Sequence, residues 1–391
     1  MAEPPLKGIR VIELARILAG PWAGQLLADL GADVIKVESP DGGDDTRKWG
    51  PPFVMSHDGE NLSAAYYHSC NRGKRSIAVD FSKPEGAETV RQLVATADVL
   101  IENFKLGGLK KYGLDYASLK AINPRLVYCS ITGFGQDGPY APRAGYDFII
   151  QAMAGMMSIT GEPGREPQKA GVAISDLFTG LYSVIAIQAA LRHAEKTGEG
   201  QHIDMALFDS QISALGNQNL NYLVSGKSPV QMGNAHMNIA PYEVLPVKDG
   251  HIILAVGNDS QFGKFCAAVG LTDLPANPDF ATNPARVANR VKLRETIIAT
   301  LATLDRDPLL AKLEAAGVPA SPINNIGQMF ADPQTIARGM RLDLDDGHGN
   351  RLPSVRAPMV MSATPLVYER PSPRLGEHTH EILAELERSA K

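Results

Sequence analysis

Residues 8–39, GIRVIELARILAGPWAGQLLADLGADVIKVES, decide the fold class of this chain. The apolar run at 8–14 predicts a buried strand, residues 21–30 predict a helix that Gly31 ends, and residues 32–39 predict a second strand. Two continuous apolar strands joined by a helix are typical of a parallel sheet that helices cover on both faces.

The same alternation continues along the chain. Three further strands are predicted at 76–80, 97–103 and 125–132, with a helix at 83–97, and residues 200–207 predict one more strand that runs into a helix. The sequence therefore predicts the α/β class, with a large domain built on a Rossmann-like, doubly wound parallel sheet.

Several cofactor motifs are missing from the sequence. The first strand is followed by ARILAGPWAG, without the G-x-G-x-x-G that binds a dinucleotide, which argues against a nicotinamide oxidoreductase. H-E-x-x-H, G-x-S-x-G, a Walker loop and metal-spaced His or Cys clusters are also missing, so we expect no metal. Because these motifs are missing, the sequence permits a reaction that uses a carboxylate side chain and no resident cofactor.

Composition narrows the class of protein. The net charge of −5 and the absence of a dense Lys/Arg block argue against nucleic-acid partners. The first residues resemble neither a signal peptide nor an organelle presequence, and no apolar run reaches about 18 residues, so no membrane partner is expected. The three cysteines, which are Cys70, Cys129 and Cys266, show no disulfide or zinc spacing. We expect a cytoplasmic protein.

The length of 391 residues exceeds what one core usually supports, so we expect two domains. Residues 225–242 are polar and rich in Gly and Asn, which marks a boundary, and strands flank a hairpin-like turn at Asp249-Gly250. The expected layout is a large domain beginning at 1–200, a linker at 201–225, a smaller α+β domain at 226–325 and a returning tail at 326–391 that completes the large domain.

Asp176 is a candidate catalytic residue because it lies at the start of a long apolar helix, in AGVAISDLFTG. Taken alone, an acid in this place favours a structural role, since it interacts with free helix N–H groups. The same position would help to keep a partly buried carboxylate ionised, as a carboxylate nucleophile requires.

Other polar groups gather in loops. The Gly/Pro-rich loop at 133–148 crowds Arg143, Tyr146 and Asp147 before a predicted helix, and His236 lies among small residues in GNAHMNIAPY. Basic residues near predicted strand ends could together bind phosphates or carboxylates: Arg16, Arg47, Lys74 and Arg75.

Several segments carry a family likeness: PLKGIRVIELARILAGPWAGQLLADLGADVIKVESP, NRGKRSIAVD, ADVLIENF, YCSITGFGQDGPY, AGYDF, AISDLFTGLY, TGEGQHIDMAL, VPASPINN and LGEHTHEIL. In these segments, and so over essentially the whole chain, the sequence resembles the class III CoA-transferases, the CaiB–BaiF family. Within the family, GDDTRKWGPPF, GNAHMNIAPY and VGNDSQF look most like dicarboxylate CoA-transferases of the succinyl-CoA:glutarate type.

The resemblance implies an interlocked homodimer whose large Rossmann-like domain is completed by the C-terminal segment. It implies that Asp176 forms acyl-anhydride and thioester intermediates, and that CoA, as a substrate, is the only cofactor. The positions that match CoA contacts of the family are Ile17, Leu18, Ala19, Lys74, Arg75, Asn103, Phe104 and Tyr146. We add Arg16 and Arg143 as candidate CoA contacts, and Arg47, Gly233, Asn234 and His236 as candidates for a substrate loop or pocket.

The predicted reaction transfers CoA from an acyl-CoA, such as succinyl-CoA, to a carboxylic acid such as glutarate. Backbone N–H groups at the start of the Asp176 helix, or in the loop at 233–236, are the candidates for an oxyanion hole. Arg16, Arg47, Arg143 and His236 are the candidate partners of a distal carboxylate.

Two alternatives are a formyl- or oxalyl-type CoA-transferase and an α-methylacyl-CoA racemase. Ser39 replaces a nucleotide-contacting arginine of formyl-CoA transferase, and Gly233-Asn234-Ala235-His236 replaces its glycine-rich lid, which disfavours a small oxalate-like substrate. The racemases carry His in a G-H-D motif where this chain has Tyr146. A tyrosine is a poor base for an α-proton at neutral pH, so racemase activity is disfavoured.

Overall fold

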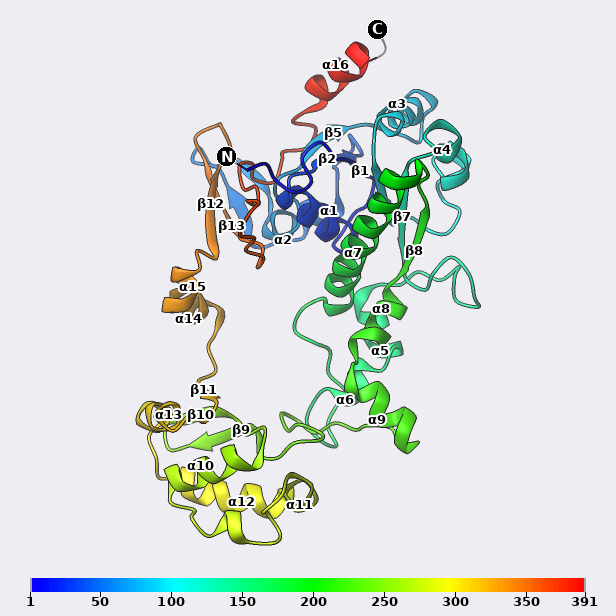
Figure 1. Cartoon of the computed structure of the whole chain (residues 1–391). Coiled ribbons are helices and arrows are strands. Elements are labelled where there is room, and N and C mark those ends of the chain that lie inside the picture. The colour runs from blue at the N-terminus through cyan, green and yellow to red at the C-terminus, as the bar shows by residue number, and fades with distance from the viewer. Residues whose placement is uncertain (1, 390–391) are drawn as a thin grey trace. The chain divides into compact units, whose positions relative to one another are not determined.

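The computed structural model describes residues 2–389, which divide into two compact units (Figure 1). Unit 1 contains the chain up to Met156, Lys169–Ser225 and the chain from Pro333 onward, and unit 2 contains Met157–Gln168 and Gly226–Asp332. Unit 1 is therefore assembled from three separate segments of the chain.

The core of unit 1 is a six-stranded sheet in which every neighbouring pair is parallel. Its strands are β1 (Arg10–Glu13), β2 (Asp33–Glu38), β5 (Arg75–Ala78), β6 (Val99–Glu102), β7 (Val127–Thr132) and β8 (His202–Ala206). The spatial order β5-β2-β1-β6-β7-β8 confirms a parallel α/β sheet. The order reverses between β1 and β6, and open α/β sheets bind ligands beyond the carboxyl ends of their strands at such a point.

Helices cover both faces of this sheet (Figure 1). One face packs against α1 (Ala19–Asp29) and α7 (Ile174–Thr197), and the other packs against α3 (Pro84–Ala95), α4 (Tyr116–Ile122) and α16 (Thr379–Ser389). Alternate residues of the strands therefore enter two separate apolar cores, which is why the strands read as continuous hydrophobic runs.

Helix α7 packs closely against α1 near the start of both helices. A Cβ atom added to Gly180 would lie 2.8 Å from the carbonyl oxygen of Ala19 and 3.0 Å from Cδ1 of Trp22, so glycine permits this approach. By length and composition alone α7 could also cross a membrane, but its buried residues belong to the core of unit 1.

The remaining elements of unit 1 lie around the sheet. They are the short helices η1 (Asp45–Lys48), α2 (Ala65–Ser69), η2 (Lys110–Tyr112), α5 (Asp147–Met153), α8 (Leu207–Ala214), α9 (Asn217–Ser225) and α15 (Pro333–Ala337), and the hairpins β3 (Phe53–Met55)–β4 (Asn61–Ala64) and β12 (Arg341–Asp345)–β13 (Arg351–Val355). Helix α6 (Met156–Ile159) lies at the division between the units.

Unit 2 has its own apolar core. An antiparallel sheet of β9 (Tyr242–Val247), β10 (Gly250–Ala255) and β11 (Ala320–Ser321) contains the predicted hairpin with its turn at Asp249-Gly250. Its helices are α10 (Asp259–Val269), η3 (Leu274–Ala276), α11 (Asn283–Ala288), α12 (Arg290–Leu301), α13 (Arg306–Ala315) and α14 (Ile326–Ala331).

Candidate active site

Asp176 lies in the first turn of α7 with its side chain partly buried. Burial raises the pKa of this carboxyl to about 7, and the neighbouring carboxylate of Asp147 acts in the same direction. The expectation that the helix start keeps Asp176 ionised is therefore incomplete, because a desolvated site and a second acid oppose ionisation.

Asp147, the first residue of α5, braces the start of α7. Its Oδ1 accepts the backbone N–H of Ser175 at 2.8 Å and that of Asp176 at 3.4 Å. Its Oδ2 accepts a hydrogen bond of 2.7 Å from Nε2 of the buried Gln151, whose Oε1 accepts the N–H of Ala170 at 2.8 Å. The backbone around Asp176 is thus fixed by side chains from a separate helix.

This brace bears on the oxyanion hole. The first four N–H groups of α7, from Ile174 to Leu177, all have acceptors within the protein. Two donate to Asp147, and the others donate to the carbonyl groups of Val172 and Ala173. The start of α7 therefore offers no free donor among them. In the loop at 233–236, the other candidate from the sequence, the N–H groups of Gly233, Ala235 and His236 also have acceptors, which are the carbonyl groups of Gly161, Met232 and Tyr242.

The structure brings together three predicted CoA contacts at the point where the strand order reverses. The N–H of Arg16, after β1, donates to Oδ1 of Asn103 at 2.9 Å, and Nδ2 of Asn103, after β6, donates to the carbonyl of Arg16 at 2.7 Å. The guanidinium of Arg16 lies 5.6 Å from the ring centre of Phe104. These residues form one surface beyond the carboxyl ends of β1 and β6.

The loop from β1 to α1 approaches the Asp176 end of α7. Leu18 and Ala19 are buried, and Ala19 contacts the turn of α7 that contains Gly180, four residues after Asp176. Tyr66 of α2 also lies close, since burial raises its pKa to about 12 and the Asp176 carboxylate adds to this rise. Asp176 and the β1–α1 loop are thus parts of one region of unit 1.

Other predicted contacts face inward instead. The ammonium of Lys74 is fully buried, with Glu13 at 2.8 Å, the carbonyl of Pro21 at 2.9 Å and Oδ1 of Asn71 at 2.8 Å. These three partners use all its donors, so Lys74 in this structure has none left for a CoA phosphate.

Two of the four arginines assigned to CoA or substrate are buried in ion pairs. Arg75 pairs with Asp33 at 2.6 Å and with Glu381 and Glu385 of α16 at 3.0 and 2.7 Å. Arg47 is buried against Glu38 at 2.6 Å. The acidic partners make these arginines structural links within unit 1.

Arg143 and Tyr146 are exposed in the loop that leads into α5. The guanidinium of Arg143 lies over the ring of Tyr140, 4.1 Å from its centre. Tyr146 immediately precedes Asp147, which contacts the start of α7, and both Tyr146 and Arg143 are accessible to a ligand.

Gly233, Asn234 and His236 belong to unit 2, whereas Asp176 belongs to unit 1. Side chains of α11 and α12 hold their segment. Arg290 donates to the carbonyl groups of His236 and Met237 at 3.0 and 2.8 Å, and the buried Arg286 donates to that of Ala240 at 2.7 Å.

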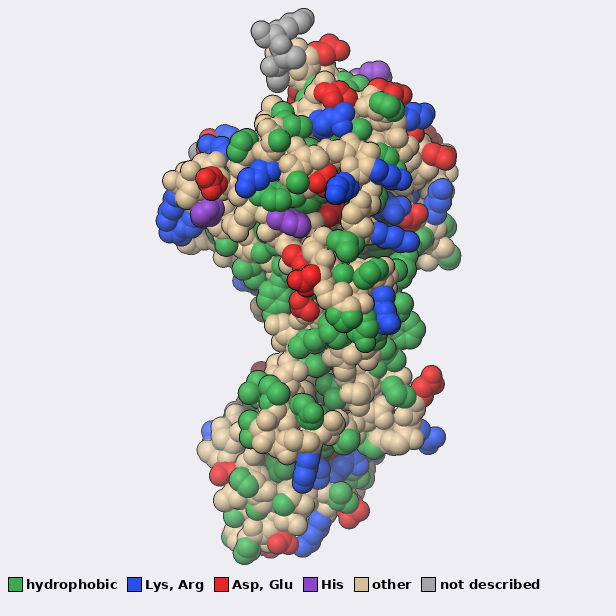
Figure 2. Space-filling view, turned by 90° about the vertical axis from the view of Figure 1, so that its right-hand side faces the viewer, with side chains coloured by type: hydrophobic (Ala, Val, Ile, Leu, Met, Phe, Trp, Pro, Cys, Tyr) green, Lys and Arg blue, Asp and Glu red, His purple; other side chains and the backbone are tan. Residues whose placement is uncertain are grey.

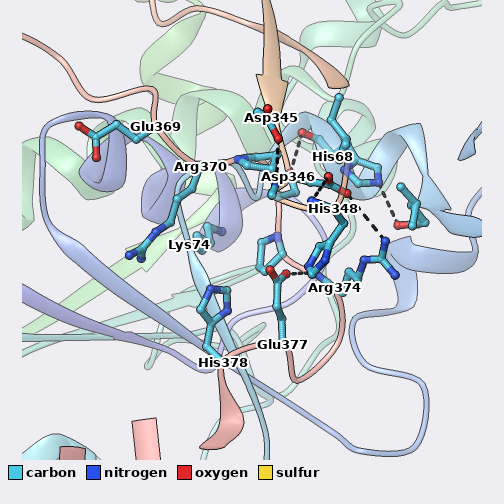
Figure 3. Close-up of a pocket in the computed structure, with 16 residues that line it drawn as sticks. His68, Lys74, Asp345, Asp346, His348, Glu369, Arg370, Arg374, Glu377 and His378 are labelled. Atoms are coloured by element: carbon cyan, nitrogen blue, oxygen red, sulfur yellow. Dashed lines mark hydrogen bonds and ion pairs between the residues drawn. The ribbon is translucent and has the colours of Figure 1, made fainter. Parts of the chain in front are cut away.

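Two cavities of unit 1 lie beside these groups, and Asp176 lines neither of them. One of about 260 Å³ lies by Lys74 and is lined by His68, Arg370, Arg374 and Glu377 (Figure 3). Another of about 330 Å³ adjoins Phe104. Among the described residues, no cluster of three or more His, Cys, Asp or Glu side chains is arranged to hold a metal ion.

The sequence profile of CoA-transferase family III matches residues 6–379, almost the whole chain. The chain belongs to CoA-transferase family III. This CoA-transferase is 64% identical over 385 residues to the succinate–glutarate CoA-transferase of Agrobacterium fabrum, covering 98% of this chain and 96% of that protein. It is 42% identical to the human succinyl-CoA:glutarate CoA-transferase, over 98% of this chain and 86% of the human protein.

A solved structure agrees with the fold of the CoA-transferase. The CaiB/BaiF family protein from Brucella suis is 61% identical and superposes with a TM-score of 0.88, covering 99% of this chain and all of that one. The protein is thus a class III CoA-transferase, an enzyme that acts on acyl-CoA and carboxylate molecules.

The sequence places Asp147 just before a predicted helix but assigns it no role in the CoA-transferase site, and Gln151 was not predicted as a site residue. Their spacing of four residues at the start of one helix was an available signal, because such residues share a helix face. The contact of both with the start of α7 depends on tertiary packing and could not be inferred locally.

Proposed function

We propose that this CoA-transferase moves CoA from succinyl-CoA to glutarate or a similar dicarboxylate, with Asp176 as the covalent nucleophile. The substrate assignment is supported by the two relatives named for succinate, succinyl-CoA and glutarate, which match nearly the whole chain. The mechanism is supported by one observation above all: Asp176 carries a partly buried carboxyl beside the β1–α1 loop, on a stretch of backbone that Asp147 and Gln151 hold in place.

In the first half-reaction, a carboxylate oxygen of Asp176 attacks the thioester carbonyl carbon of succinyl-CoA. The C–S bond breaks, which gives a succinyl–aspartyl anhydride and the CoA thiolate. The thiolate then attacks the aspartyl carbonyl of the anhydride, and the C–O bond to succinate breaks. Succinate leaves, and Asp176 carries CoA as a thioester.

In the second half-reaction, glutarate attacks the aspartyl-CoA carbonyl and releases the thiolate again. The thiolate attacks the glutaryl carbonyl of the new anhydride, which forms glutaryl-CoA and restores the Asp176 carboxylate. No net proton or water is consumed. Because a carboxylate is a weaker base than the thiolate it displaces, CoA has to stay bound so that its remote contacts lower the barriers.

The proposed contacts to CoA lie around the point where the strand order reverses. We infer that the backbone from Arg16 to Ala19, together with Asn103, Phe104 and Tyr146, contacts CoA. Arg143 and Arg16 are the proposed partners of the distal carboxylate, since Arg47 is already buried against Glu38. The guanidinium of Arg16 already forms a salt bridge of 3.0 Å with Asp45, so Arg143 is the stronger candidate to bind the distal carboxylate.

We further propose the interlocked homodimer and Rossmann-like large domain of the family resemblance, a cytoplasmic location, and no cofactor besides CoA. Exposed apolar side chains on α5, α7, α8 and α9 support a partner copy of this chain on that side, and Figure 2 shows apolar side chains on this part of the surface. They include Phe148, Ile149, Met153, Leu181, Ile185, Ile212, Leu220, Leu223 and Val224.

The assignment is tested by a matrix of acyl-CoA donors and carboxylate acceptors, with products identified by mass spectrometry. We expect succinyl-CoA with glutarate to give glutaryl-CoA, and hydroxylamine to trap acyl-CoA-dependent modification at Asp176. Turnover without any modification at Asp176 would contradict the mechanism. Solvent deuterium entering the α-carbon of a branched acyl-CoA, without an acceptor acid, would instead indicate a racemase.

A further inference from the structure

The β1–α1 loop contains a strained turn at Ile17. Its φ is +73°, and among the described non-glycine residues only Ser63 also has a positive φ. A β-branched side chain is disfavoured in this left-handed region, so the surrounding structure has to impose the conformation. Strain of this kind is retained where local geometry serves a site.

Asp44, the residue before η1, faces the amide of this turn. Its two carboxylate oxygens lie 3.4 and 3.3 Å from the N–H of Ile17. The same carboxylate accepts from the N–H and the hydroxyl of Thr46 at 3.0 and 2.7 Å, which orients it. On the other side of the turn, the thiol of Cys70 lies 3.6 Å from the carbonyl of Ile17.

A buried and balanced set of charges supports Asp44. Lys36 lies 3.0 Å from Asp44 and 3.0 Å from Glu13, and Lys74 lies 2.8 Å from Glu13. All four side chains are essentially inaccessible. Burial alone would raise the pKa of Asp44, but Lys36 and Thr46 outweigh it and lower that pKa to about 2, so the carboxylate stays charged.

The same ammonium groups also hold the loop backbone directly. Lys36 donates to the carbonyl of Ala15 at 2.8 Å, and Lys74 donates to that of Pro21 at 2.9 Å. Apolar residues of similar size would usually stabilise a core as well as a buried ion network does. Here the charges reach both ends of one short loop, so their common effect is on the shape of that loop.

We propose that Asp44 is a positioning residue for CoA transfer: with Lys36 behind it, it holds Ile17 in the left-handed turn that presents the start of α1 to CoA. Lys74, which the family resemblance predicts to contact CoA directly, has an indirect role in this network. The inference rests on the proposed function, because it takes the β1–α1 loop as part of the CoA site.

The test uses the full chain with Asp44→Ala and with Asp44→Asn, which keeps an acceptor oxygen but loses the charge. Asp41→Asn is the control, because it removes a charge from an exposed position in the loop between β2 and η1, which also contains Asp44. We expect Asp44→Ala to weaken CoA binding, and to raise the KM for succinyl-CoA, by about tenfold, with the KM for glutarate within about twofold. The Ile17 amide should exchange hydrogen about tenfold faster, and the control should match the wild type.

Asp44→Asn should give smaller changes in the same direction, and it covers the case in which Asp44→Ala does not fold. A purely structural role would lower the active fraction without changing the KM for succinyl-CoA. If CoA affinity and hydrogen exchange of the Ile17 amide stay at wild-type values in both Asp44 variants, this inference is overturned while the proposed function still stands. A wild-type chain that does not bind CoA would overturn the proposed function and this inference with it.

Discussion

Asp176 has to be a carboxylate in order to attack a thioester, yet burial and Asp147 raise its pKa to about 7. In the unfolded chain the same carboxyl ionises near its ordinary value of about 4. The folded state therefore holds the proton more tightly, so stability is lost as the pH rises from about 4 through about 7. A poorly solvated nucleophile thus lowers the stability of the fold at neutral and alkaline pH.

Replacement of Asp176 by Asn should separate activity from stability. We expect CoA transfer to fall by about a thousandfold or more, because no covalent intermediate can form. At pH 8 the melting temperature should rise by about 2–4 °C, and at pH 4 this gain should disappear. Asp137→Asn, at an exposed acid, is the matched control in scanning calorimetry. A lower melting temperature at pH 8 would contradict the argument.

Asp147→Asn should move the pH profile of the reaction. Activity should rise with pH through about 7 in the wild type, because Asp176 attacks as the anion. The substitution would remove the like charge and keep an acceptor oxygen for the N–H of Ser175, so the pKa of Asp176 should fall and the rising limb should shift to lower pH. The profile of kcat/KM against pH measures this. A limb that stays in place, or moves to higher pH, would be inconsistent with it.

The chemistry of single residues was only partly predictable. Asp176 and the group Arg16, Asn103 and Phe104 could be selected from the sequence, and the structure brings that group together. Lys74 and Arg75 also lie near strand ends, but their acidic partners come from distant parts of the chain. Glu385, for example, follows Arg75 by 310 residues, and no local pattern reveals such a pair.

The packing of two elements, α1 and α7, sets where Asp176 lies relative to the β1–α1 loop. Gly180→Ala should place a methyl group against backbone at 2.8 Å and thus separate the helices. We expect the free energy of unfolding to fall by about 1–3 kcal/mol, with a loss of kcat. Gly263→Ala in α10 meets open space and should be neutral or slightly stabilising. Urea denaturation compares the two, and equal stabilities would contradict the close contact.

The elements themselves were read correctly where periodicity is strong. The structure confirms each predicted strand of the large sheet and the helix α3, because buried parallel strands are short apolar runs and α3 is amphipathic. The hairpin β3–β4 and the two-residue strand β11 were missed. Strands β3 and β11, of three and two residues, are too short to show alternation, and β4 lacks the apolar run that marks the four-residue strands β1, β5 and β6. The missed strands form because partner strands already exist.

At the scale of the whole molecule, the apolar side chains on α5, α7, α8 and α9 predict self-association. Leu181 and Ile185 lie on one face of α7 and are 45% and 63% exposed. Ile185→Asp should therefore shift the protein from dimer toward monomer, as measured by analytical ultracentrifugation. Val291→Asp, at a residue of α12 that is 68% exposed, should leave the mass unchanged. A wild-type monomer, or an unaffected dimer in Ile185→Asp, would contradict this.

Strand β5 is an edge strand of the large sheet, and the segment before α16 closes it. The N–H of His378 donates to the carbonyl of Ser76, and the N–H of Ala78 donates to the hydroxyl of Thr379, 301 residues later. During synthesis on the ribosome, the edge of β5 stays unpaired until the intervening chain and the segment around residues 378–379 have been made. Open strand edges recruit other chains, so the growing polypeptide is most exposed to aggregation and most dependent on chaperones in that interval.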